Sequence, residues 1–428
     1  MNGINLLFDQ SVSLSKISQS QYKKLQLKVI LLRELYYNAP MSIHDLTQVT
    51  RMSTPTITRA LDELMAEGLI IDHGIGESTG GRPPWMCGMN PASWYVMGID
   101  LERAYIKMAL FDMQNNPVGE IQELNEGLDD IDDIIGFIAS KAEGLLSANN
   151  IEKKKVLGIG LSLPGLIDIR TGLSYTYLNF DRPPAELLYQ RIGIPIFIEQ
   201  DTRCMAWGEQ AFGLAKNHQN VLCLNVGSGI GLSLILNGKI FSGHSGYAGE
   251  FGHIQLVPNG RLCHCGKIGC IETVASGKII VSRAREELSA GADSLIQQLV
   301  GNNLKKVNLK TILKAAEMND QFAVHLLSDA GDALGKGIST LIHLFDPELI
   351  IIGGEMSKAA NVLIPPIERN LNIYAISRIR RDARIVASVL GDNAKLLGTL
   401  AMTMHHVFYE QHDNELQKAT ISLNPVQA

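Results

Sequence analysis

Glu250-Phe251-Gly252-His253, followed by Cys263-His264-Cys265-Gly266-Lys267-Ile268-Gly269-Cys270 and Glu272, is the most informative stretch of this sequence. It combines three cysteines and a histidine, the ligand set that structural zinc prefers. Its glycines allow the backbone to turn tightly around an ion. We therefore predict a structural Zn²⁺ site whose ligands are His253, Cys263, Cys265 and Cys270.

Two other interpretations of this stretch stay open. A disulfide would leave one of the three thiols unpaired, and the chain shows no secretion signal that would favour disulfides. His264 competes with His253 as the fourth ligand, and the alternative for it is a solvated loop residue. Cys87, Cys204 and Cys223 lie in apolar or strand-like surroundings, so we expect them to be ordinary buried thiols.

Composition sets the broad class of the protein. The chain has 428 residues, 46% of them hydrophobic and 19% charged, which is enough for two or three domains. No apolar run approaches the ~20 residues that a membrane helix needs, so we predict a cytoplasmic protein without a membrane partner. The net charge of −6 argues against indiscriminate nucleic-acid binding but permits a local contact surface.

The first ninety residues predict a winged helix-turn-helix domain. Apolar residues at helical spacing indicate a helix over 21–38, with Lys28 on its polar face. A second helix begins at Ser42, where Asp45 completes a capping box, and Val49 is expected to face inward. The third begins after the N-cap Ser53 and has a buried stripe that ends at Met65. A strand and a Gly-rich hairpin follow.

The third helix is the candidate DNA-reading element, because its small hydroxyl side chains and one arginine lie off the buried stripe. The hairpin tip adds an arginine between residues that keep the backbone thin, as suits a narrow minor groove. The predicted DNA-binding residues are Ser53, Thr54, Thr56, Thr58, Arg59, Gly81 and Arg82.

The charge of this domain leaves an alternative open. Between residues 43 and 85 there are three arginines and six carboxylates, a net charge of −3. A DNA-binding surface here requires that the carboxylates turn away from phosphate. The alternative is a small protein-interaction domain, since helix-turn-helix geometry also serves for packing.

The remainder of the chain alternates apolar strands with helices and glycine-rich turns, which predicts two α/β lobes. The expected strands are 95–101, 105–112, 118–124, 156–163, 194–199, 221–226, 231–236 and 348–352. The expected helices include 131–146 and 322–345.

With these pieces in order, the chain resembles the ROK family (repressors, open reading frames and kinases), specifically its NagC/XylR-type transcriptional regulators. The resemblance runs from about 21 to about 405, and its most specific parts are Glu250–His253 and the cysteine run. It implies a two-lobed, actin-like (ribonuclease-H-like) sugar-kinase fold behind the winged helix. It also implies zinc on the four residues named above. A sugar site between the lobes would comprise Asn179, Asp201, Glu250, His253 and Glu272.

The resemblance also bears on catalysis. Asp201 stands where the family's catalytic base would be. Family kinases carry an Asp-x-Gly-x-Thr turn after the first strand, whereas this chain reads Asp100-Leu101-Glu102-Arg103-Ala104. A glutamate at the glycine position adds bulk and negative charge where phosphate would enter. We therefore expect phosphotransfer to be lost, with Asp201 a vestigial base; the alternative is an active ATP-dependent sugar kinase carrying a DNA-binding module.

These features together predict a sugar-responsive repressor. Its expected partners are a double-stranded DNA operator, a sugar or sugar-phosphate effector, a second or further copies of the chain in a homodimer or homotetramer, and a regulatory protein. The expected domains are a flexible segment at 1–20, the winged helix at 21–90, lobes at 91–205 and 206–390, and a C-terminal helix and tail at 391–428.

Overall fold

The computed structural model describes residues 18–77, 83–128, 131 and 133–410. The chain forms two compact units. One contains residues 1–161, 185–198 and 402–428, and the other contains 162–184 and 199–401. Residues 1–17 of the predicted N-terminal segment lie outside the described residues. The lobe boundaries predicted after residues 205 and 390 stay predictions.

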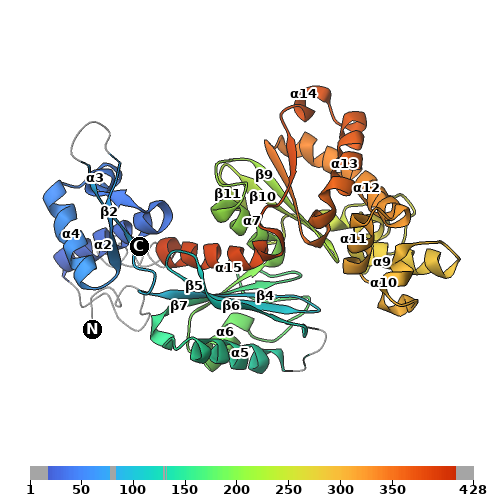
Figure 1. Cartoon of the computed structure of the whole chain (residues 1–428). Coiled ribbons are helices and arrows are strands. Elements are labelled where there is room, and N and C mark those ends of the chain that lie inside the picture. Colours follow the sequence, from blue (N-terminus) through green and yellow to red (C-terminus); the bar gives the residue numbers. More distant parts are fainter. Residues whose placement is uncertain (1–17, 78–82, 129–130, 132, 411–428) are drawn as a thin grey trace, which may run out of the picture. The chain divides into compact units, whose positions relative to one another are not determined.

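A winged helix-turn-helix domain opens the first unit, as predicted. Its three helices lie together with β2 in Figure 1, and its sheet has the order β1-β3-β2. The elements are α2 (Gln19–Asn38), β1 (Met41–Ser42), α3 (Ile43–Thr50), α4 (Thr54–Ala66), β2 (Ile70–Ile75) and β3 (Trp85–Met89).

Local sequence explains where these helices begin. Ser42 accepts a hydrogen bond from the Asp45 amide while the Asp45 carboxylate accepts one from the Ser42 amide, so the predicted capping box is confirmed. Ser53 is the N-cap of α4, but its hydroxyl makes no bond to the helix backbone. It is hydrogen-bonded to the Thr56 hydroxyl at 2.8 Å instead.

Three side chains of this domain differ from the prediction. Lys28 is buried rather than solvated, because its ammonium group binds the carboxylates of Glu63 in α4 and of Glu67, the C-cap residue of that helix. Val49 and Met65 are 52% and 36% exposed. Both lie at the edge of the apolar stripe of a short helix, where a small rotation turns a side chain from the core to the surface.

A five-stranded sheet of order β6-β5-β4-β7-β8 forms the rest of the first unit and begins the second. Strands β4, β5 and β6 are an antiparallel meander. The elements are β4 (Tyr95–Leu101), β5 (Ile106–Asp112), β6 (Pro117–Leu124), α5 (Ile134–Ala148), β7 (Val156–Leu163), α6 (Pro184–Ile192) and β8 (Ile196–Gln200).

The second unit contains another five-stranded sheet, of order β11-β10-β9-β12-β13. Strand β12 runs parallel to β9 and β13, whereas β10 runs antiparallel to β9 and β11. The strands are β9 (Val221–Val226), β10 (Ile230–Leu236), β11 (Lys239–Phe241), β12 (Leu349–Gly353) and β13 (Arg384–Ala387). The predicted α/β class is confirmed.

Nine helices of the described residues accompany this sheet or connect it to the first unit. They are α7 (Asp201–Phe212), α8 (Glu272–Ala275), α9 (Gly277–Ser289), α10 (Leu295–Leu299), α11 (Leu309–Glu317), α12 (Gln321–Phe345), α13 (Ala360–Tyr374), α14 (Ser377–Arg380) and α15 (Ala394–His405). No helix among the described residues is long and apolar enough to cross a membrane.

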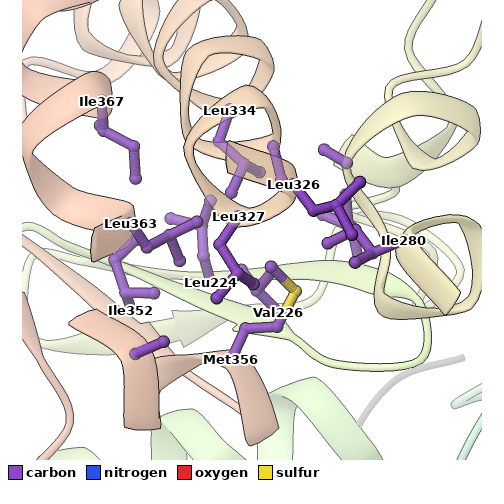
Figure 2. Packing of buried hydrophobic residues seen from close by; sticks show 14 of the residues in the cluster. Leu224, Val226, Ile280, Leu326, Leu327, Leu334, Ile352, Met356, Leu363 and Ile367 are labelled. Carbon is purple, nitrogen blue, oxygen red and sulfur yellow. The ribbon is translucent and has the colours of Figure 1, made fainter. Parts of the chain in front are cut away.

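The second sheet is apolar on both faces, which explains its nearly continuous hydrophobic strands. Leu224 and Val226 of β9 point toward α12 and α13, where Leu327 and Leu363 cover them (Figure 2). Cys223 of the same strand belongs to the opposite cluster, which includes residues of α7 and α15. Alternation along one strand therefore anchors α7 and α15 on one face and the large helical layer on the other.

Candidate functional sites

The cysteine run folds into a compact loop whose ligand atoms converge. The side-chain ligand atoms of His253, Cys263, Cys265 and Cys270 all lie within 4.8 Å of one another. Cys263 and Cys270 are buried, whereas Cys265 is exposed. The arrangement therefore offers one imidazole nitrogen and three sulfurs to a single point.

The distances fit a tetrahedral zinc ion better than a disulfide. Zn–S bonds of about 2.3 Å place two thiolates about 3.8 Å apart, and the Cys265 and Cys270 sulfurs are separated by 3.7 Å. The Cys263 sulfur lies 3.7 Å from Nδ1 of His253, close to the about 3.6 Å expected between a nitrogen and a sulfur ligand. All six cysteines of the chain are free thiols.

The backbone of this loop is closed by its own hydrogen bonds. The Cys263 amide donates to the Lys267 carbonyl at 2.7 Å, and the Gly266 amide donates to the Cys263 carbonyl at 2.9 Å. Gly269 has a φ of 78°, and a Cβ there would lie 1.9 Å from the Val257 carbonyl oxygen. Only glycine fits at this crossing of two backbone segments.

The three thiols of the cluster differ in protonation: the pKa is raised for Cys263 and Cys270 and lowered for Cys265. Burial raises the pKa of Cys270 to about 12, and hydrogen bonds with Cys265 and Cys263 add to the shift. A buried thiol with such a pKa is protonated at neutral pH unless a cation offsets the negative charge. A divalent metal that binds this donor set would supply that charge and deprotonate the thiols.

His253 connects the cysteine cluster to a carboxylate. Its Nδ1 faces Cys263, and its Nε2 lies 3.8 Å from the Glu250 carboxylate. Burial raises the pKa of Glu250, partly offset by the charges of His253 and Arg203, while Glu272 adds to the rise. These interactions place Glu250 in the electrostatic neighbourhood of Arg203 and Glu272, two residues far from it in sequence.

Glu272 links the cysteine loop to the glycine-rich turn between β9 and β10. One carboxylate oxygen lies 3.1 Å from Nδ1 of His264. The other accepts a hydrogen bond from the Ile230 amide at 3.1 Å. The His264 side chain is 64% exposed and also lies near Cys263 and Glu272, so both interpretations of it stay open.

Asp201 is the first residue of α7, where the helix dipole favours a negative charge. Its carboxylate accepts a hydrogen bond from the Asn225 side chain at 3.2 Å. Asn179 is exposed in the segment between β7 and α6, and the described residues offer its side chain no hydrogen bond. All five predicted sugar-binding residues belong to the second unit.

The turn after β4 differs from a phosphate cradle in its packing as well as its sequence. Asp100 is completely buried and pairs in register with Lys107 of β5. The Glu102 amide donates to the Tyr105 carbonyl at 2.9 Å and so closes the turn. A Cβ on Gly127 would lie 2.4 Å from the Arg103 carbonyl carbon, so a backbone segment covers the turn.

The turn after β9 also contacts a backbone segment, because the Gly277 amide donates to the Gly227 carbonyl at 2.8 Å, but unlike the first turn it borders a cavity. A cavity of about 490 Å³ lies beside it and is lined by residues of the turn, of α9 and of the segment after Gly354. The polar and charged lining residues are Ser228, Lys278, Ser282, Arg285, Glu286, Asn308 and Glu355.

The outer face of α4 carries the residues predicted to read DNA. Ser53, Thr54 and Arg59 are exposed, and Thr56 and Thr58 are half-buried. The Thr58 hydroxyl donates to the Thr54 carbonyl at 2.9 Å, so part of its hydrogen-bonding capacity is already used. Gly81 and Arg82 lie outside the described residues.

Glu63 of α4 and Glu67 at its C-cap form ion pairs with lysines of α2. Lys28 of α2 binds Glu63 at 3.0 Å and Glu67 at 2.7 Å, and Lys24 binds Glu63 at 2.6 Å. These carboxylates are neutralised on the side of α4 that faces α2. Two of the six carboxylates are therefore turned away from the exposed face of α4, as DNA binding requires. The sequence prediction had placed Lys28, which binds them, on the solvated face of α2.

A winged helix ahead of two α/β sheets, with a Cys₃His cluster beside polar residues, defines a class of two-part regulators. The family model for the ROK family matches residues 96–406, and the model for the MarR family matches residues 26–74. The chain belongs to the ROK family. The predicted resemblance is therefore confirmed.

Two curated relatives span nearly the whole chain. The xylose repressor of Bacillus spizizenii is 28% identical over 393 residues, covering 91% of this chain and 97% of that protein. The DNA-binding transcriptional dual regulator NagC of Escherichia coli is 30% identical over 375 residues, covering 85% of this chain and 88% of that protein.

The similar solved structures include a regulator and a kinase. The crystal structure of a ROK family transcriptional regulator, a homologue of the E. coli MLC protein, has a TM-score of 0.74 at 27% identity and covers 90% of this chain and 98% of that one. A ROK family glucokinase from Streptomyces griseus, in complex with glucose and AMPPNP, has a TM-score of 0.65 at 28% identity. It covers 72% of this chain and 98% of that one, so its match extends over less of the chain than that of the regulator.

Proposed function

We propose that this protein is a sugar-responsive transcriptional repressor that has lost phosphotransfer. The observation that carries the proposal is the presence in one chain of a winged helix with an exposed reading face and a ROK portion whose first turn is covered. Relatives over most of its length are named repressors and regulators, which supports the same function.

DNA binding is assigned to the winged helix. Helix α4 enters the major groove, where Arg59 reaches a phosphate or a guanine edge and the hydroxyls contact phosphates or thymine methyls. The hairpin that carries Gly81 and Arg82 contacts the minor groove. Two copies of the domain in a homodimer or homotetramer read half-sites about one DNA turn, or a small multiple, apart.

The effector is assigned to Asn179, Asp201, Glu250, His253 and Glu272. Carboxylates accept hydrogen bonds from sugar hydroxyls, and an amide both donates and accepts. His253 uses Nδ1 toward the cysteine cluster, which leaves Nε2 beside Glu250 for a hydroxyl. Zinc on His253, Cys263, Cys265 and Cys270 supplies structural support for the loop that presents these groups.

A path for the response follows from α15, whose residues belong to both units. In the second unit its Gly398 packs on α7, the helix that begins with Asp201; a Cβ there would lie 1.6 Å from the Cys204 carbonyl oxygen. In the first unit Phe408, just beyond α15, lies 5.7 Å from the Tyr36 ring of α2. Sugar binding that moves α7 would therefore be communicated through this segment to the winged helix.

An active sugar kinase is the second candidate, because Asp201 lies at the position of the family's base. The covered turn at 102–104 argues against it. Purified protein should be incubated with ATP and each of glucose, xylose and N-acetylglucosamine in a coupled assay. We expect no turnover, and a rate of about 1 s⁻¹ or faster, within the usual enzyme range, would establish the kinase instead.

A thermal-shift screen of the same sugars and their phosphates tests the effector site. A ligand at a hundred times its dissociation constant adds ~2.7 kcal/mol to the free energy of unfolding and raises Tm by a few degrees. We expect at least one member of the panel to do so. Stabilisation by none would contradict the assigned sugar site. A cytoplasmic location and a regulatory protein partner complete the proposal.

A further inference from the structure

Arg203 is the largest side chain that is fully buried in the described residues, with an exposed fraction of 1%. It lies in the first turn of α7, immediately after Asp201 and Thr202. A buried guanidinium group is stable only when its charge and donors are matched by the protein. Its partners therefore show what this part of the fold is built to hold together.

The partners of Arg203 come from two separate segments. Its Nε donates to the Glu199 carboxylate at 2.7 Å, and Nη2 lies 2.6 Å from the same oxygen. Its Nη1 donates to the Gly246 carbonyl at 2.6 Å. Glu199 belongs to β8, and Gly246 belongs to the loop 242–249 that leads directly into Glu250.

Backbone hydrogen bonds also hold the two ends of that loop: the Ala248 amide donates to the Ser242 carbonyl at 3.2 Å, and the Leu232 amide donates to the Gly249 carbonyl at 3.2 Å. Gly246 has a φ of 89°, and a Cβ there would lie 2.9 Å from the Ile167 carbonyl oxygen, so the backbone of another segment lies directly against it. Gly249 has a φ of 96° and lies against the Leu232 carbonyl. Glycines make this close approach feasible but do not stiffen the chain. The guanidinium of Arg203 ties the middle of the loop to the start of α7.

We propose that Arg203 is a positioning residue of the effector site: it holds the Asp201 end of α7 and the Glu250 loop in fixed relation by bridging Glu199 and the Gly246 carbonyl. This inference rests on the proposed sugar site, because Asp201 and Glu250 matter here as its hydroxyl-binding groups. Burial raises the pKa of Glu250 and the charge of Arg203 partly offsets this rise, which agrees with the position of Arg203 near the Glu250 loop. Arg203 is 1% exposed and its charge is matched by Glu199, so it acts through the backbone and not as a ligand anchor, although its Nη2 atom makes no hydrogen bond among the described residues.

The variants Arg203→Met and Arg203→Lys separate these roles. Hydrogen exchange of the sugar-free protein should show amides of 243–251 exchanging at least tenfold faster in Arg203→Met, while amides of β4 are unchanged. Arg203→Lys keeps the charge but cannot donate to both partners in the same geometry. The exchange rates of the loop amides in this variant should therefore lie between those of the natural protein and those of Arg203→Met. Arg369→Met, which removes an exposed ion pair with Asp332, is the matched control and should leave the loop unaffected.

Affinity for xylose, glucose and N-acetylglucosamine, measured by calorimetry, is the second readout. For whichever sugar the natural protein binds, Arg203→Met should weaken binding at least tenfold, with zinc content and operator affinity retained. If that variant does not fold, Glu199→Gln takes its place and should loosen the loop and weaken sugar binding severalfold. Unchanged loop exchange in a folded variant overturns the proposal. Failure of the natural protein to bind any sugar contradicts the proposed function, while the exchange result still decides the role of Arg203.

Discussion

The two five-stranded sheets of this protein share one strand order but differ in the turn after their first strand. In each, a three-stranded antiparallel meander is followed by two further strands. The turn after β4 carries Glu102 and Arg103 and is covered by Gly127. The turn after β9 is made of glycine and serine and lies beside a cavity of about 490 Å³.

This difference separates features that the fold requires, such as strand order, from features that only function requires, such as the turns. Strand order follows from apolar patterning, so both sheets keep it. A turn that receives phosphate is not needed for the core and can change freely once catalysis is lost. The carboxylates proposed to bind carbohydrate and the cysteine cluster, by contrast, all lie in the second unit, whose turn borders the cavity.

The largest expected effect comes from removing the proposed metal site of the second unit. Cys265→Ser should abolish zinc binding, unfold the loop 255–271 and eliminate the sugar response, because structural zinc contributes about 10–16 kcal/mol of apparent binding free energy in small domains. Zinc content by elemental analysis and Tm provide the measurement. Cys223→Ala, at a buried thiol outside the cluster, is the control and should keep its zinc. Normal regulation by metal-free protein would refute the role assigned to zinc.

In the first unit the largest effect should come from Lys28→Met. This variant leaves Glu63 and Glu67 without their buried partner, and we expect the free energy of unfolding to fall by about 2–3 kcal/mol. This is less than the loss for a fully buried pair, because both carboxylates are partly exposed. Urea unfolding followed by circular dichroism measures the loss. Lys23→Met, an exposed lysine of the same helix, should change the free energy of unfolding by less than about 0.5 kcal/mol.

The same cluster predicts a pH dependence. Burial opposes ionisation of Glu63, but hydrogen bonds from Lys24 and Lys28 outweigh it and lower the pKa below its ordinary value of 4.5. Glu63 therefore stabilises the folded domain above that value, and its contribution is lost as the pH falls through the lowered pKa. Lys28→Met should flatten this acid-side decline. An unchanged slope in the variant would show that the carboxylates are not coupled to Lys28.

Features that depend on neighbouring residues were predictable from the sequence, whereas contacts between distant residues were not. The capping box at Ser42 and Asp45 depends on neighbours three residues apart, and β4, β7 and β9 depend on apolar runs, so all were predictable. Lys28 was misplaced because its partners lie more than thirty residues away, Glu63 on another helix and Glu67 at the C-cap of that helix. Arg203 was missed for the same reason, since Gly246 becomes its neighbour only in the fold.

Operator binding should respond less strongly to single arginines. Arg59→Ala should weaken binding by about 1–3 kcal/mol and relax specificity at one base pair if it contacts a guanine, or reduce the salt dependence if it contacts a phosphate. Arg82→Ala should weaken binding severalfold. Fluorescence anisotropy with an operator fragment at two salt concentrations distinguishes these outcomes, and Arg369→Ala on the second unit is the control. Unchanged binding by both variants would assign DNA recognition to other residues.

The smallest effect is expected from rebuilding the first turn. Glu102→Gly combined with Ala104→Thr restores the kinase pattern, yet we expect turnover with ATP to stay far below ~1 s⁻¹. The reason is that Gly127 still covers the turn and Lys107 still lies opposite the buried Asp100. A coupled assay with the sugar that binds most tightly gives the answer. Robust turnover would mean that this one turn alone separates regulator from kinase.

The central claim is that sugar occupancy in the second unit is reported to DNA by the first without any phosphate transfer. The direct measurement is operator affinity of the natural protein, by fluorescence anisotropy in the absence of ATP, with and without the sugar identified by thermal shift. The account predicts that sugar weakens operator binding by about 5–150-fold, the usual range of 1–3 kcal/mol for coupling between sites. Operator affinity that is indifferent to sugar, or that changes only when ATP is added, would contradict it.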